Sequence, residues 1–146
     1  MSLAVDVATE GVRIPIGRAR VASLAEGVLR REGVHDALLS IAFVTDRRIA
    51  ALNRAHLGHT GPTDVISFGF APVDQGRVVV GDVYIAPGVA RRNAREHGSG
   101  VREELSRLVV HGVLHVLGHD HPDGEPRYAS PMWRRQEQLL RALGAA

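Results

Sequence analysis

Cysteine is absent from this chain of 146 residues, and so is lysine. Without cysteine there are no disulfides, thiolate nucleophiles or cysteine-held zinc or iron–sulfur sites, so any metal must bind histidine, carboxylate or backbone oxygen. All 18 basic residues are arginine, and the formal net charge is +2. The arginine content has two interpretations: an affinity for phosphate, which suits the planar guanidinium group, or a compositional bias unrelated to any partner.

Long apolar segments are also missing. No stretch approaches the roughly 18 to 20 apolar residues of a membrane-spanning helix. The start of the chain, MSLAVDVATEG, carries two acidic residues where a secretory signal has a basic start and an apolar segment. We therefore expect a cytoplasmic, globular protein with no membrane partner, and one domain over residues 1–146.

Hydrophobic periodicity predicts an α+β fold. Strand patterns occur at residues 3–8 with 12–16, 38–44, 63–70 and 76–87, the last holding one or two strands. Helical spacing occurs at residues 17–32, 45–57, 88–98, 101–117 and 132–144. The last helix is interpreted mainly as packing, and its Gln136 is given no other role.

Four of the eight histidines lie in HGVLHVLGHDH, residues 111–121. His111 and His115 are four residues apart, which places both on one helix face about 5 to 6 Å apart. Gly118 is expected to end the helix and to let the chain bring His121 back to them. Three imidazoles that leave one coordination position open are typical of catalytic zinc. Accidental pairing is the alternative, but unpartnered imidazoles in an apolar helix would be costly.

Two neighbours of these histidines, Asp120 and His119, lie in the same turn. Asp120 either accepts a hydrogen bond from a ligand imidazole or simply closes the loop. His119 is expected to be solvated.

The histidine spacing matches that of a large class of zinc peptidases, with one difference. Those enzymes need glutamate directly after the first histidine as general base, and here that position is Gly112. Glu104 lies on the same helix face but about 10 Å along the axis, too far to replace it. A metallopeptidase-like hydrolase is therefore the less favoured alternative.

HGVLHVLGHDH, together with LNRAHLGHTGPTDVISF (52–68) and GDVYIAP (81–87), resembles the bacterial YbeY family of metal-dependent endoribonucleases. The resemblance implies a mixed sheet of four to five strands flanked by helices, with the metal site at the end of a buried helix. It implies one Zn²⁺ per chain, bound by His111, His115 and His121. It also implies single-strand-specific cleavage in maturation of the small-subunit ribosomal RNA 3′ end and in ribosome quality control. The implied partners are ribosomal RNA, the small ribosomal subunit and ribosome-associated assembly proteins.

This chain departs from the family at Leu57, where the family usually has an arginine that contacts phosphate. Leucine cannot contact phosphate in this way. One hypothesis is that Arg54, His56 or His59 takes over the contact; the alternative is that all three are exposed surface side chains. Thr63, Asp64 and Ser67 are candidate substrate-binding residues, or ordinary turn and strand-start residues. The missing arginine keeps open a non-catalytic, zinc-containing ribosome assembly factor.

A group of arginines provides a second candidate RNA-binding surface. It can equally be a solvated helix face. The group consists of Arg91, Arg92, Arg95, Arg102 and Arg107.

Overall fold

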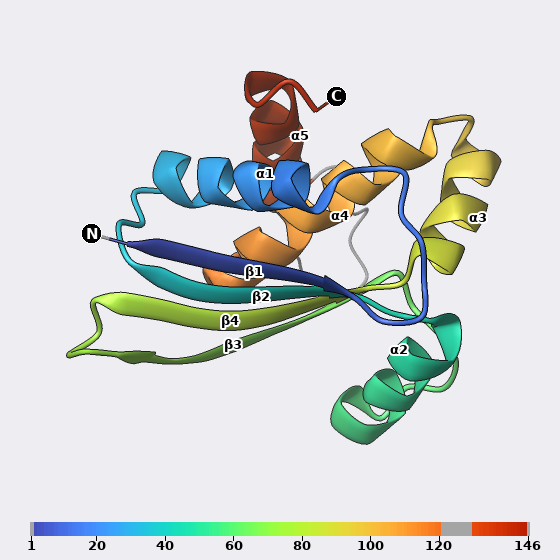
Figure 1. Ribbon diagram of the computed structural model, residues 1–146, viewed down its shortest axis with the longest axis horizontal. Helices are drawn as coiled ribbons and strands as arrows, with labels where there is room; N and C mark the ends of the chain where they lie inside the picture. The colour runs from blue at the N-terminus through green and yellow to red at the C-terminus, as the bar shows by residue number, and fades with distance from the viewer. Residues whose placement is uncertain (1, 121–129, 146) are drawn as a thin grey trace.

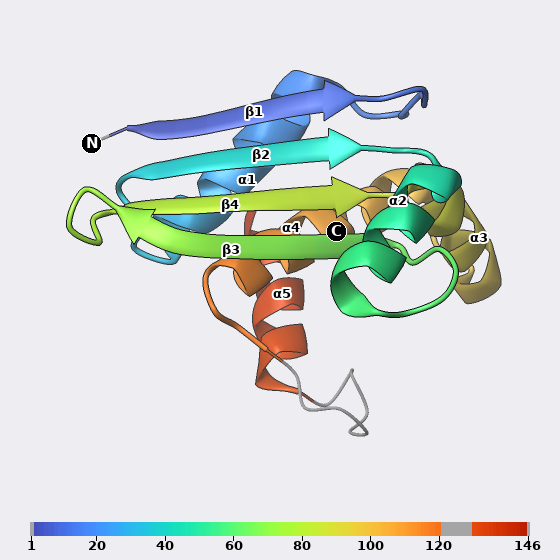
Figure 2. The same cartoon turned by 90° about the horizontal axis from the view of Figure 1, so that it is seen from below.

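The computed structural model describes residues 2–120 and 130–145. Within these ranges the chain forms a four-stranded sheet with the order β1-β2-β4-β3. Its strands are β1 (Leu3–Thr9), β2 (Ala37–Phe43), β3 (Val65–Val73) and β4 (Val78–Ile85). β1, β2 and β4 run parallel, and β3 runs antiparallel at the edge next to β4 (Figure 2). The predicted α+β fold with a mixed sheet is confirmed.

Helices cover the two faces of the sheet unequally. α1 (Arg18–Arg31), α4 (Val101–Val116) and α5 (Pro131–Ala142) lie on one side, and α2 (Asp46–Leu52) lies on the other, near the carboxyl ends of the parallel strands (Figure 1). A π-helical turn, η1 (Asn53–Leu57), continues α2, and α3 (Pro87–His97) follows β4. None of the helices in the described ranges is long and apolar enough to cross a membrane.

Alternation along the strands explains this arrangement. Leu39, Ile41 and Phe43 of β2 are buried toward α1 and α4, whereas Leu38 on the opposite face is 50% exposed. The core between sheet and helices also contains Leu105, Leu108, Val109, Val113 and Leu114 of α4. Because α4 is buried on several sides, its position is fixed by apolar packing, and the histidines it carries are positioned with it.

α4 lies unusually close to β3 and β4 because small residues allow it. A Cβ atom added at Gly112 would lie 2.5 Å from Cγ1 of Val83, and one added at Gly81 would lie 2.4 Å from Cγ1 of Val116. Neither position has room for a side chain without movement of the neighbouring valine. The close approach sets the distance between the helix and the edge strand β3.

One predicted strand segment differs from the structure. Residues 12–16 do not form a strand, because the chain turns at Gly11 (φ 68°) and continues as a partly exposed loop that buries Ile16. The segment 76–87, expected to hold one or two strands, contains one, β4. A turn with positive φ at Asp74, Gln75 and Gly76 joins it to β3.

Candidate functional site

Two of the three predicted metal ligands, His111 and His115, lie next to each other on α4. The ring centroids of His111 and His115 are 4.6 Å apart, with the ring planes at 73°. His111 is 6% exposed, so its imidazole is largely removed from solvent. The predicted pairing on one helix face is therefore present.

The predicted end of this helix at Gly118 is also confirmed. Gly118 has φ 97°, its N–H donates to the carbonyl of His115 at 3.0 Å, and the N–H of His119 donates to the carbonyl of Leu114 at 3.0 Å. This pair of bonds closes the helix with a left-handed residue, which glycine adopts without strain. The helix therefore ends at Val116, one residue after His115, and the chain leaves it at Gly118.

A cavity of about 320 Å³ opens beside the two imidazoles, between α4, η1 and the start of β3. We call it the histidine cavity; it is lined by Leu57, Thr63, Asp64, Val65, Ile66, Ser67, His111 and His115. Three predicted substrate-binding residues, Thr63, Asp64 and Ser67, thus share one cavity with both histidines. The hydroxyl of Ser67 is buried and has no hydrogen-bond partner among the described residues. A buried polar group of this kind is typical of a ligand site.

The other predicted site residues are placed differently. Arg54 lines a separate cavity with Ala50, Ala51, Ala55, Thr60 and Gly61. His59 is exposed, and its backbone N–H donates to the carbonyl of Asn53 at 3.3 Å. Asp120 is exposed, and His121 lies outside the described residues. The substrate-binding roles of Arg54 and His59 and the hydrogen bond from Asp120 to a ligand imidazole remain predictions.

The loop that leads into the cavity is held by a residue that the sequence analysis did not single out for this role. Asn53 is 6% exposed, and its Nδ2 donates to the carbonyl of Gly61 at 3.0 Å. Gly58, with φ 69°, ends η1. These contacts tie residues 58–61 back onto η1 and bring Thr63 and Asp64 to the mouth of the histidine cavity.

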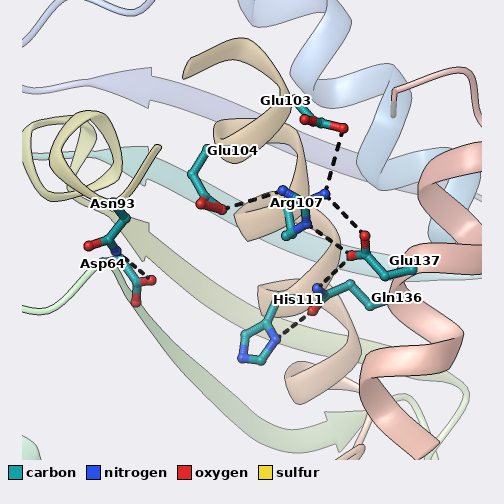
Figure 3. A network of polar contacts seen from close by, with 8 residues as sticks. All are labelled: Asp64, Asn93, Glu103, Glu104, Arg107, His111, Gln136 and Glu137. Carbon is teal, nitrogen blue, oxygen red and sulfur yellow. Dashed lines mark hydrogen bonds and ion pairs between the residues drawn. The ribbon is translucent and has the colours of Figure 1, made fainter. Parts of the chain in front are cut away.

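His111 makes a buried hydrogen bond to α5. Its Nδ1 lies 2.7 Å from Oε1 of Gln136, whose side chain is fully buried. The amide Nε2 of Gln136 donates to Oε2 of Glu137 at 3.1 Å (Figure 3). The interpretation of this helix as packing alone is therefore incomplete: Met132, Leu139 and Leu140 are buried as expected, but Gln136 contacts the candidate site.

Arg107 links the same network to the start of α4. It donates from Nε and Nη2 to both carboxylate oxygens of Glu137, at 2.9 and 3.0 Å, and lies 3.7 Å from Glu103 and from Glu104 (Figure 3). Burial alone would raise the pKa of Glu137, but hydrogen bonds from Arg107 and Gln136 and the charges of Arg107 and Arg141 together lower it. The hydrogen bond to Glu137 raises the pKa of Arg107 against the effect of burial.

These contacts correct the interpretation of Arg107 as part of an RNA-binding surface. Its side chain is 16% exposed, and carboxylates on two helices surround it. Arg92 likewise pairs with Asp46 at 2.7 Å, and Arg91 donates to the carbonyl of Arg13 at 2.9 Å. His119, expected to be solvated, lies 3.3 Å from Glu32.

The position after the first histidine cannot serve the peptidase chemistry. Gly112 faces the sheet, where an added Cβ would meet Val83 at 2.5 Å and Oγ of Ser67 at 3.3 Å. A glutamate there would clash with Val83 unless α4 or the valine moved. The structure thus gives a packing reason for glycine and argues against a peptidase base.

The described donors fit a divalent ion that prefers nitrogen ligands. His111 and His115 are adjacent, and the contact of Nδ1 of His111 with an amide oxygen is the kind of outer hydrogen bond that orients metal-binding imidazoles. In residues 2–120 and 130–145 no three histidine, aspartate or glutamate side chains gather into a metal-binding group. The third predicted ligand, His121, lies outside these ranges, so the complete ligand set remains a prediction.

Comparisons with known proteins agree with this architecture. A family model described as Endoribonuclease YbeY matches residues 7–144. Endoribonuclease YbeY of Bacillus licheniformis is 36% identical, over 99% of this chain and 97% of its own length, and that of Frankia casuarinae is 37% identical, over 99% and 76%. The solution structure of TM1509 from Thermotoga maritima is similar with a TM-score of 0.63 and 26% identity, over 95% of this chain and 88% of that one. This chain therefore belongs to the Endoribonuclease YbeY family.

Proposed function

We propose that this protein is a zinc-dependent endoribonuclease that cleaves single-stranded RNA. The observation that carries the proposal is that two imidazoles and the Thr63–Ser67 segment line one cavity, in a chain whose family is named for endoribonuclease activity. We further propose that it acts in the cytoplasm on ribosomal RNA of the small subunit, in 3′-end maturation and ribosome quality control together with assembly proteins. Single-stranded RNA suits the histidine cavity, which lies beside the edge strand β3, because its unpaired nucleotides can unstack and enter the cavity.

In the proposed mechanism His111, His115 and His121 hold one zinc ion. Bound there, the ion would supply a Lewis acid for phosphate oxygen and a water of lowered pKa. Asp64 is the carboxylate among the described lining residues, and we assign it the role of proton acceptor. The hydroxyls of Thr63 and Ser67 donate to the phosphodiester, which would give the buried Oγ of Ser67 the partner that it lacks within the described chain.

One observation favours a second candidate function. Leu57 is 50% exposed at the cavity, and no arginine belongs to the described lining. Without a cationic side chain, charge that develops on phosphate is stabilised less. A zinc-containing assembly factor that binds RNA without cleaving it is therefore the alternative.

The test compares His115→Ala with His35→Ala, an exposed histidine outside the cavity. We expect about one zinc per chain in the wild type and in His35→Ala, and little in His115→Ala, by elemental analysis. Cleavage of a single-stranded RNA should follow zinc content and should stop when a chelator is added. No zinc in the wild type after zinc is supplied would contradict the proposal. Zinc and RNA binding without cleavage would favour the assembly factor.

A further inference from the structure

The hydrogen bonds between α4 and α5 have only one consistent set of donors and acceptors. Both oxygens of Glu137 accept hydrogen bonds from Arg107, at 2.9 and 3.0 Å. A carboxylate paired in this way can only accept, so the group of Gln136 that faces it, 3.1 Å away, must be the amide NH₂. The amide of Gln136 therefore cannot rotate by 180° without losing a donor and facing two acceptors toward each other.

The orientation of Gln136 determines which nitrogen of His111 carries a proton. With NH₂ toward Glu137, the carbonyl oxygen Oε1 faces Nδ1 of His111 at 2.7 Å. An amide oxygen only accepts, so Nδ1 must donate, and in the neutral ring the lone pair then lies on Nε2. Nε2 lies on the side of the ring away from Gln136 (Figure 3).

Burial makes these preferences strong. Gln136 is fully buried and His111 is 6% exposed, so water cannot easily replace a missing partner. A wrong tautomer would place two acceptors against each other in a low-dielectric environment, which is costly. Arg107, the last residue of the hydrogen-bond network, lies 3.7 Å from both Glu103 and Glu104, so its position is also fixed.

We propose that Glu137, acting through Gln136, is a positioning residue that fixes His111 with its proton on Nδ1 and its lone pair on Nε2 before a metal ion binds. This inference rests on the proposed metal site and assigns to it a residue that does not touch the ion. Glu137 would favour metal binding because no tautomer change would be needed at His111.

The chain offers a closely matched set of variants. Glu137→Gln replaces an obligatory acceptor by an amide that can present either group, so the orientation of Gln136 is no longer determined. Glu103→Gln makes the same chemical change at another carboxylate near Arg107 that is not bonded to Gln136. The double variant Gln136→Glu/Glu137→Gln exchanges the two side chains and places a carboxylate directly against Nδ1.

The first measurement is the tautomer of His111 in zinc-free protein, from two-bond ¹⁵N–¹H correlation spectra assigned with His111→Asn. We expect the proton on Nδ1 in the wild type and in Glu103→Gln, a mixture of tautomers in Glu137→Gln, and recovery of the Nδ1 proton in the double variant. Nε2–H in the wild type, or the wild-type tautomer in Glu137→Gln, would overturn the inference. Loss in Glu137→Gln without recovery in the double variant would also overturn it, because α5 would then be disturbed generally.

The second measurement is the zinc dissociation constant by competition with a chelating dye. We expect Glu137→Gln to bind zinc about 10- to 100-fold more weakly than the wild type, the range typical of outer hydrogen-bond partners of metal ligands. An unchanged constant, beside a changed tautomer, would overturn the role in metal binding. Failure of the wild type to bind zinc would reject the proposed function, while the spectra would still decide on the tautomer.

Discussion

Two cavities meet at Asp64, and their charges are arranged in different ways. The first, of about 380 Å³, is lined by Asp64, Asn93, His97, Ser99, Glu103, Glu104, Arg107 and Trp133. Its arginine is neutralised by carboxylates of the protein itself, at 2.9 to 3.7 Å. The histidine cavity has two imidazoles, one carboxylate and hydroxyls, with no arginine in its described lining. The comparison teaches that the arginine of the first cavity is already paired within the protein, whereas the histidine cavity gathers two imidazoles, a carboxylate and hydroxyls without an arginine in its described lining.

Asp64 belongs to both cavities, so replacing it is the strongest test of the contrast. Asp64→Asn keeps the size of the side chain and can keep the contact with Nδ2 of Asn93, at 3.4 Å, but removes the proton acceptor. We expect RNA cleavage to fall by about 10²- to 10⁴-fold, the usual contribution of a general base. The measurement is kcat on a single-stranded RNA, with Asn93→Ala as control for the first cavity. Unchanged cleavage by Asp64→Asn would show that the proton goes elsewhere.

The next largest effect is expected on stability, at the residue that separates the two histidines. Gly112→Glu buries a charge against the side chain of Val83 and should lower the free energy of unfolding by about 3 to 5 kcal/mol. Urea denaturation measures the loss. Gly112→Ala is the matched control for crowding without charge and should cost much less, because alanine favours helix by roughly 1 kcal/mol over glycine. A stable Gly112→Glu protein would mean that the helix can move away from the sheet.

Adding a cationic side chain to the histidine cavity should increase the rate of RNA cleavage. Leu57→Arg puts a guanidinium group on the cavity wall, and one hydrogen bond to phosphate is worth about 1.5 kcal/mol or somewhat more. We therefore expect cleavage, measured as kcat/KM at low salt, to rise roughly tenfold. Ala55→Arg is the matched control, because it adds the same charge to η1 but faces the separate cavity that contains Arg54. An equal increase in both variants would reflect general attraction rather than a contact in the site.

The smallest expected effect concerns how the stabilisation from the Arg107–Glu137 ion pair depends on pH. The pKa of Glu137 is lower in the folded protein than its ordinary value of 4.5. The unfolded chain therefore takes up this proton first, so the stabilisation is complete above pH 4.5 and is lost as pH falls through the folded pKa. The difference in unfolding free energy between wild type and Glu137→Gln should shrink from pH 7 to acid pH. Glu96→Gln, at an exposed position of α3, should show no such change.

Local patterns were sufficient to predict most of the fold. The alternation in β2 and the helical spacing of α1 and α4 are visible within single segments, and tertiary packing agrees with them. The segment 12–16 looked like a strand because it is rich in β-branched residues. It is a partly exposed loop instead, which the chain enters after the turn at Gly11. Apolar composition alone does not distinguish these two outcomes.

The site was predictable only where its residues are close in sequence. The spacing of His111 and His115 predicts their contact, because a helix repeats within one turn. The contacts of Gln136 with His111 and of Arg107 with Glu137 join residues 25 and 30 positions apart. They depend on how α5 packs against α4, and a single sequence carries no periodic signal for that. The polar, fully buried position of Gln136 among the leucines of α5 is the feature that could have indicated it.

The packing of α4 also determines whether the histidines are ordered when the chain folds or only when a metal ion binds. His111 and His115 both belong to α4, whose apolar residues pack against the sheet and α1. The backbone positions of the two histidines are therefore ordered by folding itself. In small zinc domains the ion must organise its ligands, and the binding free energy is largely spent on folding. Here the hydrophobic core orders two of the three predicted ligands. More of the intrinsic affinity of the imidazoles is then available to hold the ion, and removing the ion should leave the fold intact.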